Sequence, residues 1–479
     1  MEQKKLSTDF VVIATLGLLY IFLPSINPSG DTLAYACSVR DGRELFMPHH
    51  LLYNALYFLI AKLFVVTHTL ELIAFMNALF AVGCLLFANA ILSKFVEKGT
   101  RLSAIIFLGF CFGFLRYATT GETYIVPLFF SLWASYCSLL RKKAFLTGLI
   151  AAAACLFHQV HVFWWLGLLF FVVATGKDNR LRRFLEYGIA SCIVPVAYLL
   201  AFYLINNDSA SVFEFVAHDF VHNSNVSVGF NPKALLLTPI NFVRTFIQVH
   251  GYMFVLLQKF WFLIGLLLCS AALLIIGCFR LKHSRKKGNV GAFELQFART
   301  HLVIFGMQLL FAFLSVGNAE FMVMLPFALL VYVFIRYKIR PVAVYLLTAG
   351  LVIWNLMFGL MPYRFLEVTP DPAISRYVAQ HPDRVYYLTD RQTVEARLKY
   401  AFPHKTFRIY GVKAHFDTGL DTLLQENSSV TTDVLTPKAL SRASFVQSAK
   451  NLSDYQILNQ DTIPFDLGIA VISRVHLFN

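Results

Sequence analysis

The sequence predicts an all-α polytopic membrane protein with about eleven transmembrane helices, followed by a small extracytoplasmic α/β domain. Three observations support this fold class. Of the 479 residues, 58% are hydrophobic and only 14% are charged, whereas about a quarter of the residues in a typical soluble chain are charged. The mean hydropathy is +0.63. The carboxy-terminal region is more polar, and in it short strand-like and helix-like segments alternate.

The basic residues predict how the helices are oriented. The formal net charge is +14, and the excess lies almost entirely in residues 1–361, in short loops on one side of the predicted bundle. This asymmetry is typical of membrane topology and does not indicate nucleic-acid binding. We therefore expect a transmembrane domain over 1–361, with a first outer loop over 27–69, and an extracytoplasmic domain over 362–479. The N-terminus is expected in the cytoplasm, and a bacterial inner membrane is the expected location.

The predicted spans follow from apolar segments approaching the roughly 20 residues that cross a bilayer. Two segments allow a second interpretation. Counting 53–66 as a span, or 144–174 as one long helix, would place basic clusters that follow them on the outer side of the membrane. Residues 53–66 are interpreted as an amphipathic helix at the membrane interface. Residues 144–174 are interpreted as two short helices meeting at 158–161. The predicted spans are Phe10–Ile26, Leu70–Leu92, Leu102–Tyr117, Tyr124–Leu140, Ala144–Phe157, Val162–Ala174, Phe184–Ile205, Tyr252–Cys278, Leu302–Val316, Phe321–Phe334 and Val342–Leu360.

The carboxy-terminal region contains the signals of a small α/β domain. Arg384–Leu388, Thr406–Tyr410 and Ile469–Val475 are predicted strands, and Arg391–Tyr400 is a predicted helix. None of the eight Cys residues lies in this region, and no CxxC motif occurs anywhere in the chain. A disulfide framework or a structural zinc site is therefore not expected.

Ionisable and polar side chains recur at the predicted outer ends of the spans. Such groups are costly at membrane depth, so they usually face a cavity and indicate function. We expect them to converge on one outward-facing site. The candidates are Asp31, His49 and His50 in the first outer loop, Arg116, Glu122 and Tyr124 near the third span, His158 and His161 in the sequence HQVH, Glu320 in GNAEF, and Arg364 after the last span.

Each candidate also has a purely structural interpretation. Asp31 could cap a helix after the Pro-Ser-Gly turn, and Arg116 could extend to lipid headgroups. Glu122 and Glu320 could be interfacial residues paired with a base. The HQVH spacing leaves a divalent metal site open, although two His residues without a nearby acid favour none. His49 and His50 are adjacent and point apart on a helix, so we expect only one of them to face a cavity.

Four short motifs, in this order along the chain, resemble those of the GT-C glycosyltransferases. They are SGDTLAY at 29–35, MPHHLLY at 47–53, GETY at 121–124 and FHQVH at 157–161. The similarity is strongest to the protein O-mannosyltransferase-like and aminoarabinose transferase-like branches. It covers roughly residues 1–360 and leaves out the carboxy-terminal region.

The resemblance implies a reaction and a set of roles. A sugar would move from a polyprenyl-phosphate carrier to a hydroxyl of a glycan, lipid or protein acceptor, with inversion, on the extracytoplasmic face. Asp31 matches the acid that acts as general base, and Glu122 matches an acid that holds the acceptor or sugar. Many relatives have two adjacent acids in the first loop, whereas here Thr32 follows Asp31, so any second acid must be Asp41, Glu44 or Glu122. No cofactor is expected.

The remaining candidates are assigned to substrate binding. Because the leaving group is a phosphate, a cation must stabilise its charge. Arg116 and Arg364 are the candidate cations, and His158 and His161 are candidate hydrogen-bond donors. His49, His50, Tyr124 and Glu320 complete the predicted substrate-binding set.

Two other classes of protein compete with this interpretation. A transporter or lipid flippase is the main alternative, but such proteins often contain internal repeats and polar groups at the membrane midplane. Neither feature is found in the sequence. A structural protein that displays the carboxy-terminal domain would need far fewer spans for an anchor.

Overall fold

The computed structural model describes residues 7–176, 179–205, 211–222, 229–287, 289–412, 416–433 and 455–477. The protein is mostly helical and divides into two compact units. Unit 1 comprises Met1–Pro24, Ser38–Gln248 and Gly265–Gly359, and unit 2 comprises Ser25–Cys37, Val249–Ile264 and Leu360–Asn479. The two-domain boundary expected from the sequence, between 361 and 362, stays a prediction.

Unit 1 is a bundle of apolar helices joined by short turns. Its elements are α1 (Thr8–Phe22), the end of α2 (Gly30–Asp41), η1 (Pro48–His50), α3 (Tyr53–Leu63), α4 (Thr69–Leu92), α5 (Lys98–Phe110), α6 (Phe112–Ala118), α7 (Ile125–Leu139), α8 (Ala144–Phe157), η2 (Gln159–His161), α9 (Val162–Ala174), α10 (Arg180–Ser191), α11 (Ile193–Leu204), α12 (Val212–His222), α13 (Ala234–Phe246), α15 (Leu263–Leu281), β1 (Arg285–Lys286), α16 (Ala292–Leu314), η3 (Glu320–Met322), α17 (Leu325–Arg336), β2 (Tyr337–Lys338), α18 (Pro341–Asn355) and η4 (Leu356–Leu360).

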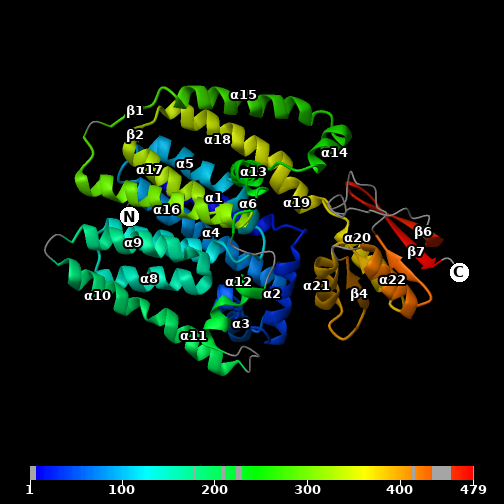
Figure 1. The fold of residues 1–479 in the computed structure, drawn as a ribbon. Coiled ribbons are helices and arrows are strands. Elements are labelled where there is room, and N and C mark those ends of the chain that lie inside the picture. Colours follow the sequence, from blue (N-terminus) through cyan, green and yellow to red (C-terminus); the bar gives the residue numbers. More distant parts are fainter. Residues whose placement is uncertain are drawn as a thin grey trace, which may run out of the picture. The chain divides into compact units, whose positions relative to one another are not determined.

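The packing of this bundle is organised around α7, α8 and α16. Helix α7 packs against α4 and α8, helix α8 packs against α9 and α10, and α16 packs against α9 and α17 (Figure 1). Helix α18 packs against α5. Gly167 of α9 shows how closely the helices approach, since a methyl group there would lie 2.4 Å from Ile304 of α16.

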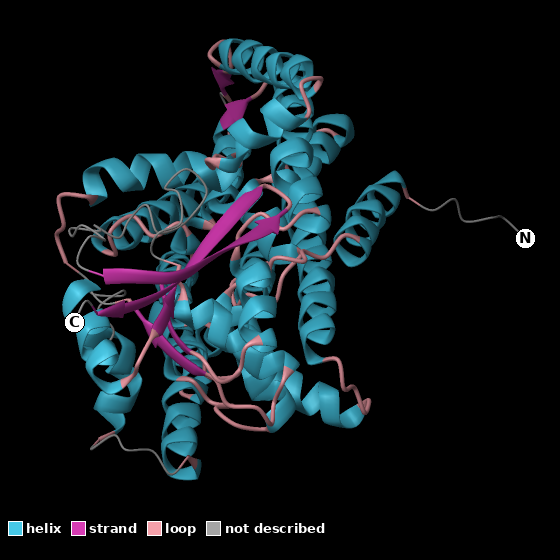
Figure 2. Cartoon of the chain, turned by 90° about the vertical axis from the view of Figure 1, so that its right-hand side faces the viewer, coloured by secondary structure: helices cyan, strands magenta, loops and turns pink. Residues whose placement is uncertain are grey.

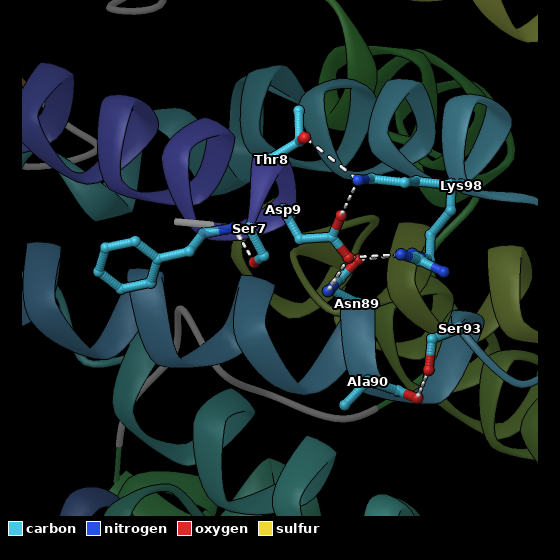
Figure 3. A network of polar contacts seen from close by, with 9 residues as sticks. Ser7, Thr8, Asp9, Asn89, Ala90, Ser93 and Lys98 are labelled. Atoms are coloured by element: carbon cyan, nitrogen blue, oxygen red, sulfur yellow. Dashed lines mark hydrogen bonds and ion pairs between the residues drawn. The ribbon is translucent and has the colours of Figure 1, made fainter. Parts of the chain in front are cut away.

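A polar network joins α1, α4 and α5 at one end of the bundle (Figure 3). Asp9 forms an ion pair with Arg101 and accepts a hydrogen bond from Asn89 at 3.3 Å. Arg101 also donates to Asn89 at 2.9 Å, and Lys98 donates to Thr8 at 3.1 Å. The network therefore fixes three helices of unit 1 to one another through charge-assisted hydrogen bonds.

Several helices are long and apolar enough to cross a membrane. In the described part of the chain there are five of them, namely Thr69–Leu92, Arg180–Leu204, Leu263–Leu281, Ala292–Leu314 and Pro341–Phe365. Counting the bent pair α5 and α6 as one span gives six, and further apolar helices are shorter. The polytopic character predicted from the sequence is confirmed, whereas the total of about eleven spans stays a prediction.

The structure confirms the prediction that residues 144–174 form two short helices. Helices α8 and α9 have the bounds predicted for the two short helices, and the turn η2 joins them. Residues 53–66 contain the predicted helix α3.

Two predicted spans are not single straight helices in the structure. The predicted span Leu102–Tyr117 bends by 67° between α5 and α6, because the chain is extended at Cys111 (φ −54°, ψ 126°). The predicted span Tyr252–Cys278 breaks at Phe260 into α14 (Tyr252–Lys259) and α15. Apolar composition alone does not record such breaks.

Unit 2 contains a five-stranded sheet (Figure 2), and helices pack against both sides of its strand β3. The strand order is β4-β3-β5-β7-β6, with β3 parallel to β4 and β5, and β7 antiparallel to β5 and β6. The elements are α14, α19 (Met361–Phe365), α20 (Asp371–Gln380), β3 (Val385–Leu388), α21 (Arg391–Ala401), β4 (Arg408–Gly411), α22 (Phe416–Glu426), β5 (Val430–Thr432), β6 (Tyr455–Phe465) and β7 (Gly468–Leu477), together with the start of α2.

Strand β3 is buried on both sides, as its apolar sequence VYYL requires. Tyr386 and Leu388 pack into the apolar core with α20 and α21, and Val385 and Tyr387 pack into the core with α22. The predicted presence of a small α/β domain is thereby confirmed. The predicted strands and helix coincide with β3, β4, β7 and α21 within three residues at each end.

Candidate functional site

Unit 1 holds a cluster of polar side chains that centres on Tyr124. The Tyr124 hydroxyl donates a hydrogen bond of 2.8 Å to Glu320 Oε2, although the two residues are 196 positions apart. The ring of His158 lies 5.1 Å from the Tyr124 ring, centroid to centroid, and the ring of Tyr117 lies 5.0 Å from it. Three of the sequence-predicted residues, Tyr124, His158 and Glu320, are thus brought together.

The two adjacent histidines of the first loop belong to the same cluster. The His49 and His50 rings are 4.0 Å apart, and the His49 ring is 6.3 Å from His158. His49 and His50 do not point apart as they would on an α-helix, because they lie in the tight turn η1. That only one of them faces a cavity stays a prediction. Pro48 at the start of this turn fixes its geometry.

Burial keeps two of these imidazoles neutral. Removal from water lowers the pKa of His50 and of His158 well below the ordinary value, and the neighbouring His49 acts in the same direction on both. Neutral imidazoles can donate and accept hydrogen bonds but supply no positive charge. His158 Nδ1 accepts a hydrogen bond from the backbone N–H of Val160 at 3.3 Å, so its Nε2 is the nitrogen that carries the proton.

His161 extends the cluster toward α7. Its Nδ1 forms a hydrogen bond of 2.7 Å with Ser131 Oγ. Its Nε2 is buried and has no hydrogen-bond partner within the described part of the chain. His158 and His161 therefore point to different surroundings, although the HxxH spacing had suggested one shared face.

A short loop presents Glu320 to Tyr124. Gly317 has a φ of +72°, and a methyl group there would lie 2.7 Å from the backbone nitrogen of Thr238. The Gly317 carbonyl accepts a hydrogen bond of 2.7 Å from Asn241, and the Asn318 side chain accepts one of 3.0 Å from the Glu320 N–H. The sequence GNAE thus specifies a tight, close-packed turn.

The charged groups near Tyr117 complete this part of the site. Glu320, Glu122, Arg116 and Arg244 all lie close enough to the Tyr117 hydroxyl to act on it electrostatically. Glu122 is buried, with 5% of its surface exposed, and Arg116 is half-buried on the short helix α6. Two carboxylates and two guanidinium groups thus lie within electrostatic range of the Tyr117 hydroxyl.

The backbone of the loop that carries Glu122 is fixed by Asn77 of α4. The Asn77 amide donates to the carbonyl oxygens of Glu122 at 2.7 Å and of Thr120 at 2.8 Å. Tyr57 in turn donates to the Asn77 side chain at 2.8 Å. A buried amide that satisfies carbonyl groups in this way holds an otherwise irregular segment in one conformation.

Asp31 lies in unit 2, in the first turn of α2. The cap of this helix is Ser29, whose hydroxyl oxygen accepts a hydrogen bond of 3.0 Å from the Thr32 N–H. Asp31 is therefore not the cap. Its side chain is exposed and accepts a hydrogen bond of 2.8 Å from the Gln392 amide, at the start of α21.

The start of α21 follows the carboxyl end of β3, next to the carboxyl end of β5. Thr389 follows β3 and donates to Asp433 Oδ1 through its N–H at 2.9 Å and its hydroxyl at 3.0 Å. Burial raises the pKa of Asp433 to about 6, and the hydrogen bonds from Thr389 partly oppose this rise. In open α/β sheets, ligands usually bind at the carboxyl ends of two neighbouring strands between which the strand order reverses. Strands β3 and β5 are such a pair.

The other predicted residues and ligands are placed as follows. Arg364 lies in α19 of unit 2, with its guanidinium 5.9 Å from the Phe365 ring centroid. In the part of the chain that the structure describes, no three His, Cys, Asp or Glu side chains gather as metal ligands. A reaction without a metal stays a prediction.

Arg244 and Gln392 are among the residues that sequence reasoning did not select. Arg244 was visible only as one of the few basic residues on the predicted outer side. Its Nη1 donates to Asn241 at 3.1 Å, and its buried Nε has no hydrogen-bond partner among the described residues. Gln392 carries no motif, and nothing in the sequence connects it with Asp31.

The fold matches known structures, although the sequence does not match known families. No protein-family model and no curated protein sequence matches the chain. The apo oligosaccharyltransferase of Archaeoglobus fulgidus matches with a TM-score of 0.50 and 11% identity, over 98% of this chain and 75% of that chain. ArnT from Cupriavidus metallidurans matches with a TM-score of 0.43 and 12% identity over 97% of both chains. The same protein bound to undecaprenyl phosphate matches with a TM-score of 0.42 and 11% identity, over 97% of each chain.

The chain therefore has a GT-C-like fold, as its motifs predicted. At 11% identity the similarity concerns the fold and assigns no residue.

Proposed function

We propose that this protein is an integral-membrane glycosyltransferase that moves a sugar from a polyprenyl-phosphate carrier to an acceptor hydroxyl, with inversion. The observation that carries the proposal is the buried ionisable cluster around Tyr124, in a bundle of apolar helices with a GT-C-like fold. Ionisable groups buried among membrane helices are costly and usually serve a substrate.

The proposed chemistry divides the residues by role. Asp31 takes the proton of the attacking hydroxyl as general base. The acceptor oxygen forms the new bond to the anomeric carbon, and the bond from that carbon to the carrier phosphate breaks. The phosphate leaves with the bonding electron pair, so a cation must stabilise it. Arg116 is the proposed cation, and the half-buried Arg244 is added to it, with Arg364 as a further candidate.

The remaining polar groups are proposed to bind and orient the sugar. Glu122 and Glu320 can accept hydrogen bonds from sugar hydroxyls, and Tyr124 holds Glu320 in place. His158 and His161 are neutral donors or acceptors, and His49 and His50 line the same cluster. The extracytoplasmic face of a bacterial inner membrane is the proposed location, with a glycan, lipid or protein as acceptor.

A transfer assay tests this function. The purified protein in nanodiscs is mixed with a panel of undecaprenyl-phosphate-linked radiolabelled hexoses and aminopentoses, and with a cell-envelope extract as the source of acceptor. We expect one donor to lose its label to the extract and to release undecaprenyl phosphate, and Glu320→Gln to slow this release. Tyr345→Phe, at an exposed position of α18, is the matched control. Movement of an intact lipid between leaflets without sugar transfer would support the flippase alternative.

A further inference from the structure

The first outer loop of the chain is attached to the carboxy-terminal sheet domain at two separate points. Asn27, which precedes α2, donates to the carbonyl oxygens of Tyr363 at 3.0 Å and of Leu366 at 2.8 Å. Its side-chain oxygen Oδ1 accepts a hydrogen bond of 3.0 Å from the Val368 N–H. Asn27 is buried, with 6% of its surface exposed. This first attachment fixes the chain four residues before Asp31.

The second attachment lies at Asp31 itself. Gln392 Nε2 donates a hydrogen bond of 2.8 Å to Asp31 Oδ1. Directly beside it, Gly30 packs against α21 so closely that an added methyl group would lie 3.3 Å from both the nitrogen and the α-carbon of Thr393. The backbone of α2 at Gly30 therefore lies close to the backbone of α21 at Thr393, one residue before Asp31.

The start of α21 is a rigid support for these contacts. Asp390 caps the helix and accepts a hydrogen bond of 3.2 Å from the Thr393 N–H. The preceding Thr389 is anchored on Asp433 through two hydrogen bonds. Strand β3, which leads into this turn, is fully buried. Gln392 thus extends from a turn whose backbone is fixed on both sides.

A neutral amide suits a partner that must point a carboxylate in one direction. It orients one oxygen of Asp31 and carries no charge. It therefore neither lowers the basicity of the carboxylate, as a cation would, nor competes for the proton, as a second carboxylate would. A displacement of about 1 Å in a reacting group can cost on the order of 100-fold in rate. We infer that Gln392 is a positioning residue, through which the carboxy-terminal domain aims the general base Asp31 at the acceptor hydroxyl.

This inference rests on the proposed function, because it takes Asp31 as the base. It assigns to the carboxy-terminal domain a role that neither the motifs nor the fold comparison gives it. The domain is then part of the catalytic machinery and not an appended module.

The experiment compares Gln392→Ala and Gln392→Glu with the control Gln380→Ala, at an exposed position near the end of α20. Transfer is measured with the undecaprenyl-phosphate-linked sugar that the wild-type protein uses. We expect Gln392→Ala to lower kcat by about 10- to 100-fold with an unchanged KM for the donor. Gln392→Glu places a second carboxylate against Asp31, which disfavours ionisation. We therefore expect the acidic limb of its kcat profile to move to higher pH.

A second readout does not depend on turnover. Hydrogen exchange, followed by mass spectrometry of the peptide 25–37, should become faster in Gln392→Ala and stay unchanged in Gln380→Ala. Gly30→Ala should also lower kcat. Gly251→Ala should not, because no atom in the described part of the chain lies within 4 Å of a methyl group added there.

The outcomes separate the two proposals. Unchanged exchange and unchanged kcat in Gln392→Ala, together with an inactive Asp31→Asn, would overturn the inference and leave the proposed function standing. Full activity of Asp31→Asn would overturn both the role of Asp31 and that of Gln392. A loss of kcat in Gln392→Glu with no movement of the acidic limb would reduce Gln392 to a structural contact and overturn the inference.

Discussion

At the scale of residues, the polar cluster in unit 1 divides into neutral and charged groups. Burial keeps His50 and His158 neutral, so neither can balance the charge of a phosphate. Arg116 and Arg244, which both act on Tyr117, are the cations of this cluster. The arginines are therefore the groups that should determine the affinity for an anionic lipid.

Arg116→Ala should weaken the binding of undecaprenyl phosphate by about 10- to 150-fold, because one charge-assisted contact to a phosphate contributes about 1.5–3 kcal/mol. Binding is measured by native mass spectrometry of the protein in nanodiscs with undecaprenyl phosphate alone. The control Lys142→Ala removes a positive charge at an exposed loop. A wild-type affinity in Arg116→Ala would contradict this role and support the alternative that Arg116 contacts lipid headgroups.

Asp433 gives the carboxy-terminal domain a predictable dependence on pH. Its pKa of about 6 in the folded protein exceeds the ordinary value near 4 in an unfolded chain. The folded state therefore binds more protons between these two values, and stability falls as the pH rises through this window. The full effect above pH 6 is at most about 3 kcal/mol.

Asp433→Asn should remove this dependence, because asparagine is neutral and its oxygen can still accept the hydrogen bonds from Thr389. We expect the Tm of the variant to exceed that of the wild type by a few degrees at pH 7.5, and the difference to shrink toward pH 4.5. Thermal unfolding of the whole chain in detergent measures it. A difference that is constant with pH would show that Asp433 is ionised in the folded protein over the whole range.

At the scale of elements, the turn between α16 and η3 determines where Glu320 points. Gly317 is required there because its φ is positive and because its α-carbon approaches the backbone of Thr238. Gly306, by contrast, lies within α16, and no atom of the described residues lies within 4 Å of a methyl group added there. Substitution of these two glycines by alanine should therefore change the free energy of unfolding in opposite directions.

Gly317→Ala should destabilise the protein by about 1–3 kcal/mol, since it combines backbone strain with a steric overlap. Gly306→Ala should stabilise it by about 0.5–1 kcal/mol, as expected for a helix interior. Thermal unfolding in detergent distinguishes them. Equal and small shifts for both variants would mean that the Gly317 turn adapts, and that it does not fix Glu320.

The elements also show what the sequence could predict and why. The ends of α8 and α9 were predictable because counting basic residues on each side excluded one long helix. Strands β3, β4 and β7 of unit 2 were predictable from their apolar, β-branched and aromatic residues, whereas β5 and β6 were not predicted. Helix α2 was missed because its residues have no apolar periodicity that would separate it from a loop. The bend at Cys111 could not be predicted, because the sequence is apolar on both sides of it.

The candidate site was predictable as a set but not as an arrangement. Tyr124, His158 and Glu320 were selected because polar groups are conspicuous beside apolar spans, and the structure places them together. Gln392 was not selected, because its contact with Asp31 joins residues 361 positions apart. An exposed glutamine on a polar helix gives no local signal of such a contact.

At the scale of the whole molecule, the proposed reaction needs a defined sidedness. The basic loops predict that Lys142 is cytoplasmic and that the carboxy-terminal domain, with the exposed Lys405, is extracytoplasmic. In a background without the exposed Cys192, Cys269 and Cys278, Lys405→Cys should react with a membrane-impermeant maleimide in intact spheroplasts. Lys142→Cys should react only after permeabilisation. Labelling of both positions in intact spheroplasts would contradict the topology.

The central claim is that this chain is a sugar transferase in which Asp31 is the base. The most direct test is the transfer assay with Asp31→Asn, beside Asp383→Asn as a control at another exposed aspartate of unit 2. Asparagine keeps the shape but cannot take the proton, so we expect transfer to fall by about 10²- to 10⁴-fold. The control should keep the wild-type rate, and all three proteins should share one Tm. Wild-type transfer by Asp31→Asn would contradict the account.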